Sequence, residues 1–160
     1  MFHRPRAAIA AATLIGAGLI CALPAAAHDP ATAPAKPRNA LPPETLQVID
    51  LGKEIPGMEG RSLRMRKVTL LPGGALPLHS HTDRPAIVYV LEGRVREHYP
   101  ADKAPIVYGA GDARTEQAGV DHWIENIGET PVVGVVVDVV NDGSAPAFTT
   151  EEVRRRYGLE

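Results

Sequence analysis

Three histidines are spaced so that their side chains could meet at one metal ion. His79 and His81 stand one residue apart in the stretch HSH, shortly before the apolar run AIVYVLEG. Alternate side chains of a β-strand point to the same face, so both imidazoles would project from one side of a sheet. His122 lies in a second β-like stretch, DHWIENIG, and could supply a third nitrogen from across a barrel interior. The pattern predicts a site for a divalent transition metal.

Short β-like runs, punctuated by glycine and proline, must position these histidines. The runs occupy residues 46–51, 63–70, 72–81, 86–93, 94–99, 105–112, 121–128 and 131–140. Their spacing of about ten residues favours an antiparallel all-β sandwich or barrel. Only residues 149–159 have a helical pattern, in which Thr149 is the expected N-cap and Glu152 its capping-box partner.

The first 27 residues have the features of a secretory signal peptide. A short basic segment precedes an apolar stretch that ends in Ala25, Ala26 and Ala27, which predicts cleavage near Ala27 and a periplasmic or secreted protein. The apolar stretch is interrupted by Gly16 and Gly18 and is too short for a stable membrane anchor. Residues 28–44, rich in proline and alanine, are expected to form a flexible linker, and residues 45–160 the β-barrel domain.

Composition excludes several functions for the mature chain. Cys21 is the only cysteine, and cleavage would remove it together with any disulfide, thiolate metal ligand or cysteine nucleophile. The formal charge is −2 for the whole sequence and becomes about −4 when Arg4 and Arg6 are removed, and the longest basic run is RRR near the C-terminus, so nucleic acid is not an expected partner. A small-molecule ligand is the expected partner, and a homodimer is left open.

The histidines and glycines resemble the two sequence motifs of the cupins. The first motif, G-x5-H-x-H-x3/4-E-x6-G, is matched by Gly73, His79, His81 and Gly93. The second, G-x5-P-x-G-x2-H-x3-N, is matched by Gly111, Gly119, His122 and Asn126. The resemblance implies a double-stranded β-barrel of the jelly-roll type. It also implies a divalent metal in the barrel, such as Fe, Mn, Zn, Cu or Ni, held by His79, His81 and His122.

The sequence departs from the first motif at its glutamate, which is usually a metal ligand. Ala86 stands at that position, and Gln117 replaces the proline of the second motif. Either the site has three histidines only, as in some oxygen-using cupins such as the thiol dioxygenases, or another acid takes the place of the glutamate. Strand parity makes Glu97 the first candidate, because an inward Val95 carries Glu97 inward. Glu116, just before the turn that leads to His122, is the second.

Two further expectations follow from the same parity. Glu97 would act as a metal ligand or as a base, and His98 would point to solvent. Arg84, in the loop after His81, is placed at the cavity mouth, where it could hold a substrate carboxylate or pair with Glu97. Glu97 and Arg84 are therefore the candidate catalytic residues.

Together these features predict an exported metal-binding cupin that acts on a small molecule. A metal with three protein ligands keeps open coordination positions, which suits a dioxygenase, an isomerase or a lyase. The alternative is a barrel without catalysis that binds a small ligand, or binds or senses metal. The substrate does not follow from the fold, because one architecture supports many reactions.

Overall fold

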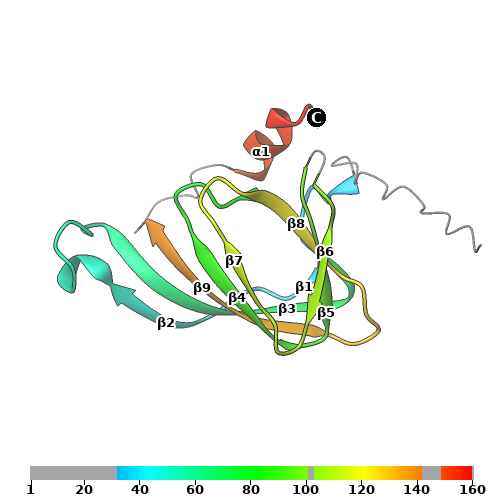
Figure 1. Ribbon diagram of the computed structural model, residues 1–160, viewed down its shortest axis with the longest axis horizontal. Helices are drawn as coiled ribbons and strands as arrows, with labels where there is room; N and C mark the ends of the chain where they lie inside the picture. The colour runs from blue at the N-terminus through cyan, green and yellow to red at the C-terminus, as the bar shows by residue number, and fades with distance from the viewer. Residues whose placement is uncertain (1–31, 101–102, 142–148, 160) are drawn as a thin grey trace, which may run out of the picture.

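A curled antiparallel sheet makes up most of the structure, a computed structural model that describes residues 32–100, 103–141 and 149–159. Its strands are β1 (Arg38–Ala40), β2 (Glu44–Asp50), β3 (Arg61–Ser80), β4 (Ala86–Glu92), β5 (Arg94–His98), β6 (Ile106–Gly109), β7 (Ala113–Glu116), β8 (Asp121–Asn126) and β9 (Val132–Asn141). They are ordered β6-β5-β8-β3-β9-β4-β7, with β1 and β2 also paired to β3. Figure 1 shows the sheet closing round an interior, as the all-β expectation required.

Strand β3 runs through the centre of the sheet. It includes the β-like run 63–70 and all but the last residue of the run 72–81, which the sequence pattern separates. Its first half pairs with β2 and β9, and its second half pairs with β1 and β8. The change of partners takes place around Gly73, which has a φ of +68°, and Gly74, where a Cβ would lie 2.7 Å from the backbone oxygen of Asn39 in β1. Glycine therefore lets the strand bend without ending.

Residues 32–44, the described part of the segment 28–44 that was expected to be a flexible linker, contribute to the fold. Residues Arg38–Ala40 form β1 against β3, and Ala33 is buried. Composition indicated a solvated segment, but the second half of β3 has an open edge that β1 pairs with. The expected signal peptide, residues 1–27, lies outside the described residues.

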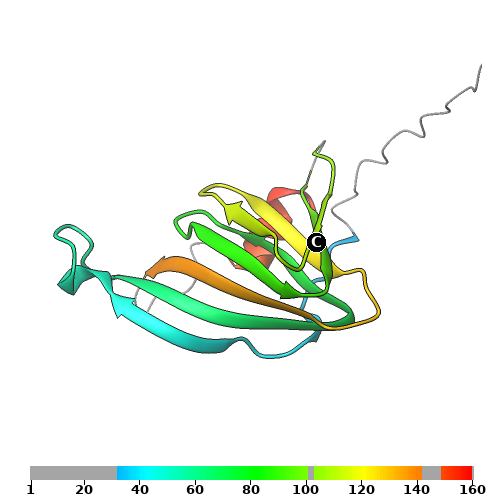
Figure 2. The same ribbon diagram turned by 60° about the horizontal axis from the view of Figure 1, so that its bottom comes forward.

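Two apolar clusters hold the sheet in its curled shape. The first packs around one end of the interior and consists of Leu70, Val90, Val95, Tyr108 and Val132. The second lies on the outer side and joins Leu78, Trp123, Ala33 and Val153, a residue of helix α1 (Thr150–Arg156). Burying each large side chain stabilises the fold by roughly 1.5–3 kcal/mol. In Figure 2 the helix lies behind the strands, against β3 and β8.

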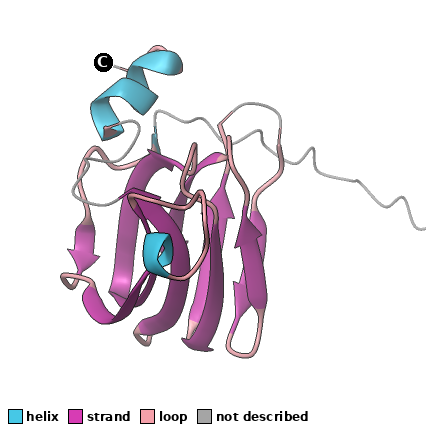
Figure 3. Ribbon diagram, turned by 90° about the vertical axis from the view of Figure 1, so that its left-hand side faces the viewer, coloured by secondary structure: helices cyan, strands magenta, loops and turns pink. Residues whose placement is uncertain are grey.

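Helix α1 begins as the sequence predicted and fixes the start of β8. The hydroxyl of Thr149 accepts from the backbone of Glu152, whose carboxylate accepts from the backbone of Thr149, a complete capping box. At the other end, Arg156 and Tyr157 donate to the carboxylate of Asp121, the first residue of β8. Figure 3 shows α1 above one end of the barrel. Within the described residues, every helix is too short or too polar to cross a bilayer.

Candidate metal centre

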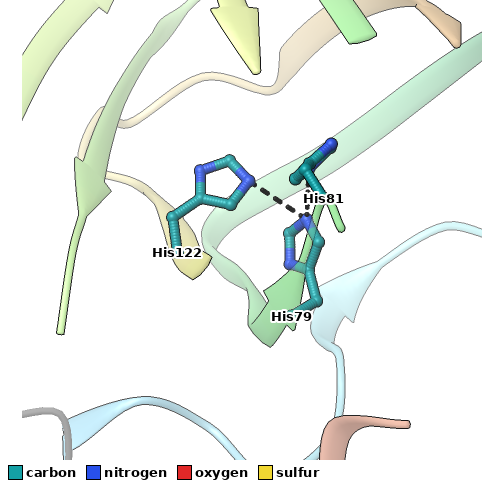
Figure 4. Close-up of side chains that lie close together, drawn as sticks. All are labelled: His79, His81 and His122. Atoms are coloured by element: carbon teal, nitrogen blue, oxygen red, sulfur yellow. Dashed lines mark hydrogen bonds between the residues drawn. The ribbon is translucent and has the colours of Figure 1, made fainter. Parts of the chain in front are cut away.

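His79, His81 and His122 meet inside the barrel, as the strand parity predicted. His79 on β3 is paired directly with His122 on β8, and the backbone N–H of His81 donates to Val120 just before that strand. The Nε2 atom of His79 lies 3.1 Å from the Nε2 of His81 and 3.1 Å from the Nε2 of His122. Figure 4 shows the three rings turned toward one another.

Each ring is oriented by an acceptor on its other nitrogen. Nδ1 of His79 lies 2.9 Å from the carbonyl of Pro77, and Nδ1 of His81 lies 3.0 Å from the carbonyl of Arg84. Nδ1 of His122 lies 2.7 Å from Oε1 of Glu97. A carbonyl or carboxylate oxygen only accepts, so each Nδ1 carries the hydrogen and donates it. In the neutral imidazoles, the three Nε2 atoms then carry lone pairs that are directed toward one another.

The donor set fits a metal ion on chemical grounds. Burial, followed by the neighbouring His122, lowers the pKa of His81 to about 3, and the same causes hold the pKa of His79 well below 6.5. These two imidazoles are therefore neutral at physiological pH, the state that binds metal. Two nitrogens at 90° on a metal about 2.1 Å away would lie about 3.0 Å apart, close to the separations found. Converging lone pairs repel unless a cation lies between them.

Ala86, which replaces the motif's glutamate, lies between two buried acids. Its cross-strand neighbours are Glu116 on β7 and Asp138 on β9, and such pairs share a face of the sheet. Glu116 approaches the histidines: Oε2 lies 3.3 Å from Nε2 of His81, and Oε1 lies 3.8 Å from Nε2 of His122. Burial raises the pKa of Glu116. A carboxylate is thus present beside the three nitrogens, on the strand next to the expected one.

Glu97 points inward as expected but lies behind His122. Its carboxylate meets Nδ1 of that ring, whereas the cluster of ligand atoms is on the Nε2 side. Burial raises the pKa of Glu97, but the hydrogen bond from His122 and the charge of Arg114, whose Nε is 3.6 Å from Oε2, leave the pKa below its usual value. Glu97 is therefore placed to orient His122, and Glu116 is the better placed of the two candidate ligands.

Arg84 lines the cavity, but its partner is not Glu97. Its Nη1 lies 3.2 Å from Oδ2 of Asp138, and Arg114 is the guanidinium beside Glu97. The expected Arg84–Glu97 pair was wrong because β4 and β9 bring Asp138 to the Arg84 side of the barrel, while β5 places Glu97 on the opposite side of His122.

The expectation that His98 points to solvent was also wrong. His98 is fully buried, its ring stacks on Trp123 at 4.8 Å, and its Nε2 lies 2.8 Å from the carboxylate of Glu125. Parity placed it on the outer face, but there Trp123 packs against Ala33 and Val153, so the outer face is covered.

A cavity of about 610 Å³ opens beside the histidines. His79, His81, Glu116 and Arg84 line it together with two residues that sequence reasoning missed, Arg64 and Arg66. The sequence did contain evidence for them. In RSLRMRKVTL, residues 61–70, both arginines alternate with the same period as Val68 and Leu70 and therefore share their face of the strand. Asp138, equally missed, is a lone charge in the apolar run VVGVVVDVV.

Comparison with known proteins agrees with this arrangement. Residues 66–138 match the model of the cupin domain. The chain carries a cupin domain. This domain holds the two cupin histidine motifs and all three clustered histidines.

Curated relatives match the same part of the chain at low identity. Germin-like protein 8-14 of Oryza sativa subsp. japonica is 26% identical over 87 residues, 52% of this chain and 41% of that protein. Germin-like protein 3-8 of the same plant is 30% identical over 88 residues, 53% of this chain and 37% of that protein. The chain spans about two fifths of the length of these relatives. A solved cupin domain from Bordetella pertussis is 20% identical, with a TM-score of 0.47, over 64% of this chain and 94% of that one.

Proposed function

We propose that this chain is a metalloenzyme that acts on a small molecule, with a divalent transition metal held by His79, His81 and His122. The observation that carries the proposal is the convergence of three Nε2 atoms, each of which has a free lone pair in the neutral imidazole because its Nδ1 donates elsewhere. A chance cluster of buried histidines would have no reason to present three acceptors to each other. Imidazole nitrogens suit Fe, Mn, Zn, Cu or Ni.

Glu116 is proposed as the carboxylate of the site, in place of the glutamate absent at Ala86. Glu97 is proposed as a positioning residue that holds His122 in the tautomer with a free Nε2, a role typical of carboxylates behind metal-bound histidine. A metal bound here would polarise an oxygen-bearing group of the substrate. Because burial raises the pKa of Glu116, its carboxyl group is suited to hold or accept a proton at the cavity wall. Such a site suits a dioxygenase, an isomerase or a lyase.

The test is the metal content of the purified protein and of its histidine variants. Replacing His79, His81 or His122 with alanine should each remove most of the bound metal, measured by elemental analysis after exposure to each candidate ion. His98→Ala is the matched control: it removes a buried imidazole and weakens the fold, but should leave the metal stoichiometry unchanged. Equal metal loss in all four variants, or no metal in the parent protein, would contradict the proposal.

Export is proposed from the sequence alone. The basic, apolar and alanine-rich segments within residues 1–27 are the supporting observation. The intact mass of the exported product should correspond to a chain that begins at His28. A full-length species confined to the cytoplasm would contradict it.

A further inference from the structure

The inner face of β3 changes from polar to apolar along the strand. Ser62, Arg64, Arg66, Val68 and Leu70 alternate along it and all line the cavity. Leu76, farther along β3, and residues of neighbouring strands extend the apolar end: Val88, Val90, Val95, Tyr108, Ile124 and Val132. The cavity is therefore charged at one end and apolar at the other.

The charged end holds more guanidinium groups than the carboxylates there neutralise. Asp138 is fully buried and accepts from Arg64 at 3.1 and 2.9 Å, from Arg66 at 2.9 Å and from Arg84 at 3.2 Å. Asp83 also lines the cavity, but its carboxylate accepts from Arg61 and Asn141. Even if Glu116 is ionised, Asp138 and Glu116 supply two negative charges to three guanidinium groups. One positive charge at this end of the cavity is therefore not neutralised.

Arg66 has donor capacity that the described residues do not use. Its Nη2 donates to Asp138, but its Nε is buried and has no hydrogen-bond partner within the described part of the chain. A buried guanidinium with unused N–H groups costs free energy, and an oxyanion in the cavity that accepts from an accessible N–H of the same group would offset part of that cost. The second terminal nitrogen, Nη1, also makes no hydrogen bond within the described part of the chain, and the side chain is 17% exposed where it lines the cavity. Nη1 is therefore the donor that a ligand in the cavity can reach.

We propose that the cavity binds a small amphipathic carboxylate. Its carboxylate accepts from Arg66, beside Arg84, and its apolar body fills the end of the barrel lined by Val68 and Leu70. The volume is in the range of small-molecule sites, roughly 300–1,000 Å³. The inference rests on the proposed function in one respect, since it names the ligand class of the same cavity.

The position of the anion also suits the histidine centre. Asp138, Ala86 and Glu116 are opposite one another on three adjacent strands, so the Asp138 and Glu116 backbones are about 10 Å apart. Arg66 lies on the Asp138 side and the histidines on the Glu116 side. A carboxylate held by Arg66 would therefore present the carbons next to it to the histidines.

The test is calorimetric titration with three probes: octanoate, its neutral analogue octanamide, and oxalate, which lacks an apolar body. Octanoate should bind one per chain, at least about tenfold more tightly than either of the others. Arg66→Gln should weaken octanoate at least about tenfold and leave octanamide unchanged. Arg155→Gln, which removes an exposed arginine of α1, is the matched control and should change neither.

Each titration is run on metal-loaded and on chelator-treated protein, which separates this inference from the proposed function. If octanoate binding depends on the metal and not on Arg66, the carboxylate binds the metal and the inference is overturned. If octanoate binding depends on Arg66 in protein that never takes up metal, the inference stands and the proposed function fails. If Arg66→Gln does not fold, the probes decide on the parent protein: equal affinity for octanoate and octanamide, or tighter oxalate binding, overturns the inference.

Discussion

Asp138 and Glu116 occupy equivalent places in the sheet but have opposite surroundings. Both are buried, and both lie directly across from Ala86, one on β9 and one on β7. Burial raises the pKa of each carboxyl group, but hydrogen bonds and charges from Arg64, Arg66 and Arg84 leave the pKa of Asp138 below its usual value. The pKa of Glu116 stays raised.

The difference shows that the partners of a buried acid, rather than its depth, decide its role. Asp138 finds its counter-charges within the chain, so its ion pairs are complete in the fold. Glu116 lies beside His81, but an imidazole with a pKa of about 3 is neutral at physiological pH and offers no charge. A carboxylate in that position gains most from a cation brought from outside.

Removing the charge of Asp138 should have the largest effect on stability. Asp138→Asn leaves three guanidinium groups without their shared carboxylate and should lower the free energy of unfolding by about 3–5 kcal/mol. The pKa of Asp138 is lowered in the fold, so its contribution is complete above the unfolded value and is lost as pH falls through the folded pKa. In urea unfolding, the deficit should be full near neutral pH and should shrink below about pH 4.

Asp50→Asn is the control for that measurement. Asp50 is a half-exposed acid that caps the short helix η2 (Leu51–Lys53), and asparagine caps equally well. The change should leave the free energy of unfolding nearly unchanged. Equal losses in the two variants would mean that the arginine partners of Asp138 contribute nothing.

Removing the charge of Glu116 should affect metal binding instead. Glu116→Gln should weaken metal affinity by on the order of 100-fold, because a first ligand should matter at least as much as the groups behind it. Without metal, the variant should be at least as stable as the parent, since glutamine avoids the burial cost of a carboxylate. Competition with a chromophoric chelator and urea unfolding measure the two effects. A destabilised metal-free variant with unchanged metal affinity would assign Glu116 the structural role of Asp138.

Moving the acid one strand over should recover part of that affinity. In the double variant Ala86→Glu with Glu116→Gln, the carboxylate returns to the motif position and should restore metal affinity by about tenfold over Glu116→Gln alone. Ala86→Gln with Glu116→Gln has the same volume without the charge and should restore nothing. If both double variants bind metal equally, the row of residues 138, 86 and 116 does not face the metal.

The sequence predicted the features that depend on local pattern. Alternation placed His79 and His122 on inward faces, and the Thr149–Glu152 spacing predicted the start of α1. What a local pattern does not contain is register: nothing near Ala86 indicates that Glu116 and Asp138 would be its neighbours on adjacent strands. Parity likewise placed His98 on the outer face without indicating that the outer face is covered there.

The role of Glu97 depends on which nitrogen of His122 its carboxylate meets, and strand alternation alone does not determine that. Parity correctly turned the side chain inward, but the pairing of β5 with β8 brings it to the Nδ1 side of His122. An inward acid near a histidine can be a ligand or can support one, and only the nitrogen that it meets separates the two roles.

Of the substitutions expected to weaken metal binding, Glu97→Gln should have the smallest effect on metal affinity. In Glu97→Gln the amide oxygen can still accept from Nδ1 of His122, so metal affinity should fall only about tenfold, from loss of the charge. Glu97→Ala should cost more, because the tautomer is no longer held, and nitrogen NMR shifts of the imidazole in metal-free protein should show Nε2 partly protonated. Glu125→Gln, which changes the acid beside His98, is the control and should leave the metal unaffected. A loss in Glu97→Gln as large as that in Glu116→Gln, with an unchanged tautomer, would make Glu97 itself a ligand.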